Sequence, residues 1–335
     1  MMVTPVRLRL VPVVVALALG AAACGSESTP EGDERSDAST SVENCGREVA
    51  PDASIERAVA INQPAVELLL SLGLEDRIAA VGMNDPVLPE LAEAASKVTT
   101  FDAEFPSFET VLEQDPDLVY TTFNYTFTAE GIADRDRFED LGVRTYQSPS
   151  ECGGQEAQQT DALELDDMYA EIGDVATLFG VQERGDELVS SLKARADEAA
   201  VDLDAEDVTL GWWYASTKTP YFAGCCGAPG IMTRGVGATN AFEDSDQLWP
   251  EVSWESILDR DPTVLVLADL ARGGDGDSAA DKIAFLESDP VARRLTAVKE
   301  KRYVVLEGTT MDPSVRNVQG IEQLADGLRD LGVVK

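Results

Sequence analysis

Two stretches of the chain share one pattern: 106-PSFETVLEQDPDLVY-120 and 252-VSWESILDRDPTVLV-266. Each contains a serine, an aromatic residue and a glutamate, followed by an apolar pair, an Asp-Pro dipeptide and an apolar run. Ser107 and Ser253 are suitable helix N-caps, and an Asp-Pro pair ends a short helix and leads into a strand. The copies lie about 150 positions apart, which is the length of an ordinary domain. The repeat therefore predicts equivalent places in two similar lobes.

Strand and helix patterns alternate on both sides of the repeat. A helix at 65–73, after a loop at 62–64, separates the first two strands, and a helix at 317–331 closes the chain. Alternation of this kind favours an α/β fold with mainly parallel sheets. The expected strands are 58–61, 78–81, 118–121 and 143–146 in the first half and 208–214, 264–267 and 303–306 in the second.

The two halves are joined by a helical region between residues 161 and 205. Gly180 separates two helical patterns, and the second carries Leu188, Leu192 and Ala196 at i, i+4 spacing among many charges. This spacing is typical of a long helix that lies on a surface. We therefore expect an N-terminal α/β lobe at 45–180, an interlobe helix at 181–204 and a C-terminal α/β lobe at 205–335.

The composition excludes several functions. The net charge is −36, with 62 acidic and 26 basic residues, which makes nucleic acid an unfavourable partner. Histidine is absent, so the commonest general base and the commonest transition-metal ligand are missing. A Ser-His-Asp hydrolase, a zinc protease and a histidine-ligated metal site are therefore disfavoured, and we expect no metal site and no resident cofactor.

The N-terminus indicates export. Arg7 and Arg9 precede an apolar run at 10–23 that is short for a membrane span but suits a signal peptide at 1–23. The following Cys24 lies in a sequence that resembles a bacterial lipobox, with Ala21 where Leu is usual, and an ordinary signal peptide is the alternative. A polar tether follows at 24–44. We expect a protein that is lipid-anchored at the extracytoplasmic face of the cell membrane.

Four further cysteines lie in a compartment that permits disulfides. Cys45 and Cys152 are placed to link the ends of the first lobe. Cys225 and Cys226 would then pair with each other, which strains the geometry because adjacent Cα atoms lie about 3.8 Å apart. Free thiols or cross-pairing remain equal alternatives for these two residues.

Candidate ligand-binding residues follow the strands, because open α/β sheets bind ligands beyond the carboxyl ends of their strands. Basic residues are scarce there, which favours a neutral or weakly charged chelate, of hydroxamate or corrinoid type, over an anionic catecholate. Only one of Trp212 and Trp213 can face the cleft, since neighbouring strand residues point to opposite faces. The candidates are Asn62, Gln63, Asn84, Asn124, Tyr125, Trp213, Tyr214, Tyr221, Arg234 and Arg316.

The chain resembles the iron-siderophore and vitamin B12 class of ABC-transporter substrate-binding proteins from about Cys45 to its end. The matching stretches are the repeated segments, the helical join, and residues 61–82, 230–244 and 302–308. The resemblance implies two Rossmann-like lobes in the class III periplasmic-binding-protein fold. It implies a receptor, not an enzyme, that holds a ferric-siderophore-like chelate between its lobes, with metal present only within that ligand.

The resemblance also implies partners. It places on Glu109 and Glu255 the contacts that one glutamate per lobe makes with arginines of the two permease subunits. A separate subunit then hydrolyses ATP, and the receptor is expected to be a monomer. The alternative is that each glutamate only complements the partial positive charge at its own helix N-terminus.

Other functions remain open at this point. One is a receptor for a corrinoid, haem or another cofactor-like solute, and another is a receptor that signals instead of transporting. The rival from another class is an exported hydrolase with paired carboxylates. A carboxylate of strongly raised pKa that faces a second one in the cleft would favour the hydrolase, whereas an aromatic cleft with unperturbed acids would favour the receptor.

Overall fold

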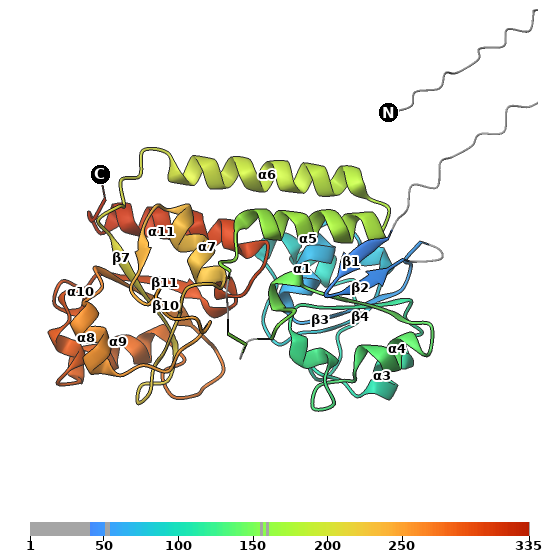
Figure 1. Ribbon diagram of the computed structural model, residues 1–335, viewed down its shortest axis with the longest axis horizontal. Coiled ribbons are helices and arrows are strands. Elements are labelled where there is room, and N and C mark those ends of the chain that lie inside the picture. The colour runs from blue at the N-terminus through green and yellow to red at the C-terminus, as the bar shows by residue number, and fades with distance from the viewer. Residues whose placement is uncertain (1–40, 51–53, 155–156, 159–160, 335) are drawn as a thin grey trace, which may run out of the picture. The chain divides into compact units, whose positions relative to one another are not determined.

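The computed structural model describes residues 41–50, 54–154, 157–158 and 161–334 (Figure 1). The predicted signal peptide, Cys24 and nearly all of the tether lie outside the described residues. Within the described part of the chain, none of the helices combines the length and the apolar character that a membrane crossing requires.

The first lobe is built on a four-stranded parallel sheet with the order β4-β3-β5-β6. All four strands match the predicted ranges to within one residue, and their apolar side chains are buried because helices cover both faces. One prediction was wrong: Gln63 and Pro64 open the first helix, where Pro provides a suitable φ angle. The elements are β3 (Ala58–Ile61), α1 (Gln63–Ser71), β4 (Ile78–Gly82), α2 (Ala92–Ala95), α3 (Phe108–Leu112), β5 (Leu118–Thr121), α4 (Arg135–Glu139) and β6 (Arg144–Gln147).

The second lobe has a sheet with the order β11-β10-β7-β8, and β9 also pairs with β7. Every pairing is parallel except that of β7 with β8. The strands predicted from the sequence correspond to β7, β10 and β11, with ends that differ by one or two residues. The elements are β7 (Thr209–Ala215), β8 (Tyr221–Phe222), α7 (Ala228–Gly235), β9 (Thr239–Asn240), α8 (Trp254–Arg260), β10 (Val264–Asp269), α9 (Ala279–Ser288), α10 (Thr296–Lys299) and β11 (Tyr303–Glu307).

A long helix connects the lobes. Helix α6 (Gln182–Ala200) packs against α5 (Leu165–Leu178) of the first lobe and α11 (Arg316–Asp330) of the second (Figure 1). Leu192 and Ala196 are buried, as the i, i+4 spacing predicts. Arg195 of α6 also donates two hydrogen bonds to Glu322 of α11, at 2.8 and 2.7 Å. The two-lobed α/β organisation with a joining helix is therefore confirmed.

The repeated segment has the same local structure in both lobes. Ser107 Oγ accepts a hydrogen bond from the Thr110 backbone amide at 3.2 Å, and Ser253 Oγ accepts one from Ser256 at 3.1 Å. The aspartate of each Asp-Pro pair is left-handed, with φ of 50° and 41°. Each short helix thus begins at a serine cap and ends at a sharp turn before a strand.

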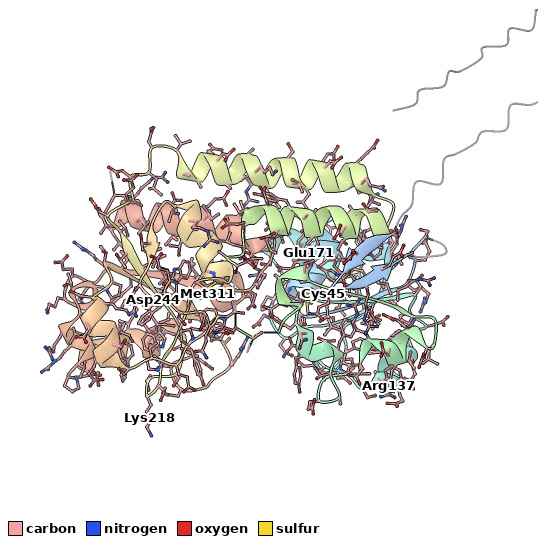
Figure 2. The ribbon with its side chains drawn as sticks, viewed as in Figure 1. Cys45, Arg137, Glu171, Lys218, Asp244 and Met311 are labelled. Carbon is pink, nitrogen blue, oxygen red and sulfur yellow. A yellow bond between two sulfur atoms is a disulfide. The ribbon has the colours of Figure 1, made fainter. Side chains whose placement is uncertain are left out.

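A short hairpin that the sequence did not predict precedes the first sheet. Its strands are β1 (Val42–Asn44) and β2 (Arg47–Val49), with Cys45 in the turn (Figure 2). A disulfide joins Cys45 to Cys152, with their Cα atoms 5.4 Å apart, and a second joins the neighbours Cys225 and Cys226. Short 3-10 turns lie at Glu75–Arg77, Pro89–Leu91, Asn124–Phe127, Pro149–Glu151, Ala292–Arg294 and Gly308–Met311.

Candidate functional site

A cleft of about 1240 Å³ lies between the two lobes. Its walls come from loops at the carboxyl ends of the strands, as expected for parallel sheets. The volume exceeds the roughly 300–1,000 Å³ of common small-molecule pockets and suits a bulky solute. The aromatic lining is Phe105, Phe123, Tyr125 and Tyr214, the amides are Asn84 and Asn124, and the charged residues are Asp85, Glu104, Glu130, Glu151, Asp312 and Arg272.

Four of the ten predicted ligand-binding residues line this cleft: Asn84, Asn124, Tyr125 and Tyr214. The Tyr125 ring is 48% exposed and meets the edge of Phe105, with centroids 5.2 Å apart. These residues supply a flat aromatic surface and two amides that donate or accept hydrogen bonds. They come from both lobes, so a bound solute would contact both.

Asn62 lies behind the cleft wall instead of in the cleft. Its side chain is buried, donates to Glu104 at 3.0 Å and accepts from Thr121 at 2.8 Å. Asn84 donates to the other oxygen of Glu104 at 2.6 Å. Asn62 therefore positions the Glu104 carboxylate, which forms part of the wall.

The prediction that Trp213 binds the ligand is corrected by the burial of this residue. Its ring has no exposed surface and packs on Trp254 and Phe222. Both faces of β7 are core, so neither Trp212 nor Trp213 reaches the cleft. The residue that does reach it is Tyr214, next along the strand.

Tyr221 and Arg234 also do not line the cleft. Tyr221 donates to Glu251 at 2.8 Å, and Arg234 pairs with Glu164 at 3.1 Å. Both sites are at least partly open to solvent, so these contacts contribute little to stability. We assign neither residue to ligand binding.

Arg316 forms a buried ion pair with Glu67 between the lobes, and Gln63 is a neutral hydrogen-bond donor to the same carboxylate. Arg316 of α11 donates to Glu67 of α1 through Nε at 2.7 Å and Nη2 at 2.6 Å. Gln63 and the Leu88 backbone amide donate to the same carboxylate. The side chains of Arg316 and Glu67 are 2% and 0% exposed. We call this contact the interlobe ion pair, and it places both predicted residues in structural roles.

The second lobe contributes one carboxyl, Asp312, and one guanidinium, Arg272, to the cleft. Burial raises the pKa of Asp312 to about 7. The Arg272 guanidinium opposes this effect, while the negative charges of Asp85 and Glu104 add to it and Arg316 opposes it weakly. Among the described residues that line the cleft, Arg272 is the single cation.

Two further groups have shifted pKa values. Burial, with a smaller contribution from the charge of Asp312, raises the pKa of Glu151 to about 8. Burial also raises the pKa of Tyr214 to about 12, although Arg272, whose Cζ lies 5.9 Å from the ring centroid, acts in the opposite direction. The cleft thus combines an aromatic wall with two carboxyls that resist ionisation, features that point to a receptor and to a hydrolase respectively.

Sequence reasoning missed Glu104, Phe105, Glu151 and Asp312. Glu104, Phe105 and Asp312 lie in irregular loops and Glu151 in a short 3-10 turn, where no periodicity marks which side chains face inward. Arg272 is one of the few basic residues in the loops beyond the strands, and this loop position is a signal that the sequence does offer. The described residues contain no group of three or more Cys, Asp or Glu arranged to hold a metal ion.

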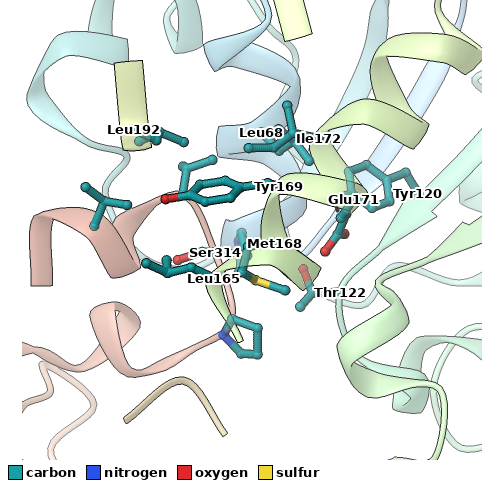
Figure 3. A pocket seen from close by; sticks show the side chains of 14 residues that line it. Leu68, Tyr120, Thr122, Leu165, Met168, Tyr169, Glu171, Ile172, Leu192 and Ser314 are labelled. Atoms are coloured by element: carbon teal, nitrogen blue, oxygen red, sulfur yellow. Dashed lines mark hydrogen bonds between the residues drawn. The ribbon is translucent and has the colours of Figure 1, made fainter. Parts of the chain in front are cut away.

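A second cavity, of about 20 Å³, lies beside α5 where the first lobe meets α6 and the start of α11 (Figure 3). It has room for about one water molecule, which excludes it as a solute site. Glu171 on its wall accepts hydrogen bonds from Tyr120 and Ser148, each at 2.7 Å. Burial raises the pKa of Glu171 to about 7, and these two donors oppose the rise.

Known proteins resemble this chain over most of its length. The family model described as "Periplasmic binding protein" matches residues 59–309. A vitamin B12-binding protein of Vibrio campbellii is 24% identical in an alignment over 261 residues that covers 73% of this chain and 87% of that protein.

Solved structures agree with the fold. A periplasmic binding protein from Veillonella parvula has a TM-score of 0.75 at 22% identity, covering 87% of this chain and 97% of the other. The structure described as an ABC-type Fe3+-hydroxamate transport system from Saccharomonospora viridis has a TM-score of 0.71 at 26% identity, covering 86% and 98%.

Proposed function

The chain belongs to the periplasmic binding protein family, and from this premise we propose that it is an extracytoplasmic receptor for a ferric hydroxamate-type chelate. Its fold is the class III periplasmic-binding fold. The observation that carries the ligand class is the lining of the cleft, which combines four aromatic rings with five carboxyls and one guanidinium. Such a wall disfavours a trianionic catecholate or the two propionates of haem, and it favours a neutral or cationic complex.

The receptor would deliver its solute to an ABC importer permease. Glu109 and Glu255 are exposed at the second positions of α3 and α8, one on each lobe, where arginines of two permease subunits can reach them. A diacylated Cys24 and the polar tether would hold the receptor at the membrane as a monomer. No covalent step is required of this chain, because a separate subunit hydrolyses ATP.

Two other candidates have specific support. The similarity to a vitamin B12-binding protein supports a corrinoid, which is also bulky and weakly charged. Glu151 and Asp312 meet the criterion of two carboxyls with raised pKa in one cleft, which supports the hydrolase. Membership of a binding-protein family argues against the hydrolase.

Tryptophan fluorescence tests the proposal. The Trp249 ring lies 4.9 Å from the Tyr214 ring, so a coloured chelate in the cleft should quench it. Ferric hydroxamates, ferric catecholates, cobalamin, haem and an iron salt are titrated, with absorbance corrected for. We expect saturable quenching by a ferric hydroxamate at micromolar concentration or below. Selective quenching by cobalamin would replace the ligand class, and silence across the panel would refute the receptor for these solutes.

Matched tyrosine variants locate the binding. Tyr214→Ala should weaken the titration by tenfold or more, because it removes a large aromatic contact. Tyr221→Ala removes the same ring from outside the cleft and should leave the affinity unchanged. Equal effects of the two substitutions would argue against binding in this cleft.

A further inference from the structure

Two carboxyls of the cleft lack the hydrogen-bond donors that buried carboxyls usually have. Glu151 of the first lobe is 3% exposed, and its Oε2 has no hydrogen-bond partner among the described residues. Across the cleft, the backbone carbonyl of Asp312 accepts from Asn317, but within the described chain no hydrogen-bond donor reaches the Asp312 carboxyl. The described residues therefore supply no hydrogen bond that would stabilise a negative charge on Glu151 Oε2 or on the Asp312 carboxyl.

Three other buried or half-buried carboxylates of this chain, Glu67, Glu104 and Glu171, show what compensation looks like. Glu67 accepts from Arg316 and from two further donors. Glu104 and Glu171 each accept from two side chains. Buried carboxylates are normally satisfied in this way, and an exception needs an explanation.

The charges around these two carboxyls also fail to offset the cost of burying them. Asp312 faces Arg272 and Arg316 as well as the negative Asp85 and Glu104, and its pKa is still raised to about 7. Glu151 faces Asp312, and burial with that charge raises its pKa to about 8. The nearby cations are thus insufficient to bring the pKa values of these two carboxyls back to the ordinary range. A further cation between them would be bound as they ionise.

We propose that Glu151 and Asp312 form a subsite for a primary ammonium group on the bound solute, so that the receptor selects a chelate that carries an amine. The inference rests on the proposed function, because the ammonium enters the same cleft as the chelate. An ammonium offers three donors to acceptors from two lobes. A metal ion is disfavoured because the described residues contain no group of three carboxylates or thiolates that is arranged to hold one.

The subsite is tested with two chelates that differ only in whether they carry a free primary amine. Ferric desferrioxamine B carries a free primary amine, and its N-acetylated form is otherwise the same chelate without that charge. At pH 8 we expect the acetylated complex to bind about ten- to a hundredfold more weakly, the range for a charge-assisted hydrogen bond. Affinity for the amine complex should rise between pH 6 and pH 8.5, as both carboxyls ionise. Equal affinities, or a fall with rising pH, would overturn the subsite and leave the receptor standing.

Single variants assign the preference to these residues. Glu151→Gln and Asp312→Asn keep the size of the side chain and remove the ionisable group, so each should reduce the preference for the amine complex to less than threefold. Glu113→Gln changes an exposed carboxylate outside the cleft by the same charge and should leave the preference intact. A preference that survives both cleft variants would contradict the assignment.

If neither chelate binds, a simple amine tests the ammonium subsite separately from the proposed chelate. Pentylamine and pentanol have the same chain length and differ in charge. At millimolar concentration and pH 8, pentylamine should raise the unfolding temperature of the wild type but not of Glu151→Gln, and pentanol should raise neither. The absence of an amine-specific shift in the wild type would overturn the subsite, whereas a missing chelate response alone would overturn only the proposed ligand class.

Discussion

The interlobe ion pair makes a quantitative prediction about stability. Arg316 and Glu67 are nearly or fully buried, and two hydrogen bonds of 2.7 and 2.6 Å join them across 249 positions of sequence. Arg316→Met removes the cation and leaves the Glu67 charge with two neutral donors, Gln63 and the Leu88 amide. The substitution therefore isolates a negative charge at the junction of the lobes.

The expected cost follows from this burial. Removing one partner of a buried ion pair costs about 3–5 kcal/mol, because the remaining charge is left uncompensated. That is a large share of the roughly 5–15 kcal/mol by which ordinary domains are stable. In the double variant Glu67→Gln with Arg316→Met no charge is buried, and a carbonyl oxygen still accepts from Leu88. We expect the double variant to lose only about 1–2 kcal/mol.

Urea unfolding measures both values. Midpoints and slopes are followed by tryptophan fluorescence and far-UV circular dichroism at pH 7. Arg195→Met is the matched control, because the Arg195–Glu322 pair also joins α11 to an element far away in the chain, α6, but its side chains are 40% and 33% exposed. Its loss should cost less than about 1 kcal/mol. A cost of under 1 kcal/mol for Arg316→Met, or a double variant less stable than the single one, would refute this reasoning.

Three other predictions concern separate parts of the chain. Glu109→Lys with Glu255→Lys should abolish uptake in cells and leave solute affinity unchanged, and loss of binding by the purified double variant would contradict the docking role. Serine at both Cys45 and Cys152 should lower the free energy of unfolding by about 2–4 kcal/mol, since this disulfide closes a long loop; unchanged urea midpoints would argue against it. Glu171 has a pKa of about 7 in the fold against an ordinary value of 4.5, so the stability it gives at acid pH is lost as pH rises toward and through 7. Glu171→Gln should reduce the pH dependence of the unfolding free energy between pH 5 and pH 8, to which Glu151 and Asp312 also contribute, and an unchanged slope would contradict the role of Glu171.

Most of the fold was predictable because its signals are local. Buried parallel strands are short apolar runs, and Leu192 and Ala196 mark the inner face of α6 by their spacing. The errors arose where a local signal had two meanings. Pro64 reads as a loop residue but is equally suited to the first turn of a helix. The β1–β2 hairpin has strands of three residues, too short to show an alternating pattern.

The cleft was only partly predictable, because loop side chains have no period. The alternation of side chains along a strand correctly placed Trp212 and Trp213 on opposite faces of β7. It did not show that both of these faces are covered by the core. Tyr214 reaches the cleft because it lies near the end of that strand. Glu151 and Asp312 are 161 positions apart, and only the folding of two lobes toward each other brings them to one site.

The acidic residues show most clearly what the sequence does not predict. It contains 62 of them, and no local pattern distinguishes the buried or ligand-binding ones from the others. Burial turns a few into distinct chemical groups. Glu67 is buried with Arg316 and is explained by the fold alone, as a contact that joins the lobes. Glu151 is nearly as buried but has no donor for its Oε2 among the described residues. Since an unpaired buried charge costs several kcal/mol, Glu151 must either stay protonated or take its partner from outside the chain. In a receptor, that outside partner is the solute, and this is why the unsatisfied carboxyl, not the satisfied one, carries information about the ligand.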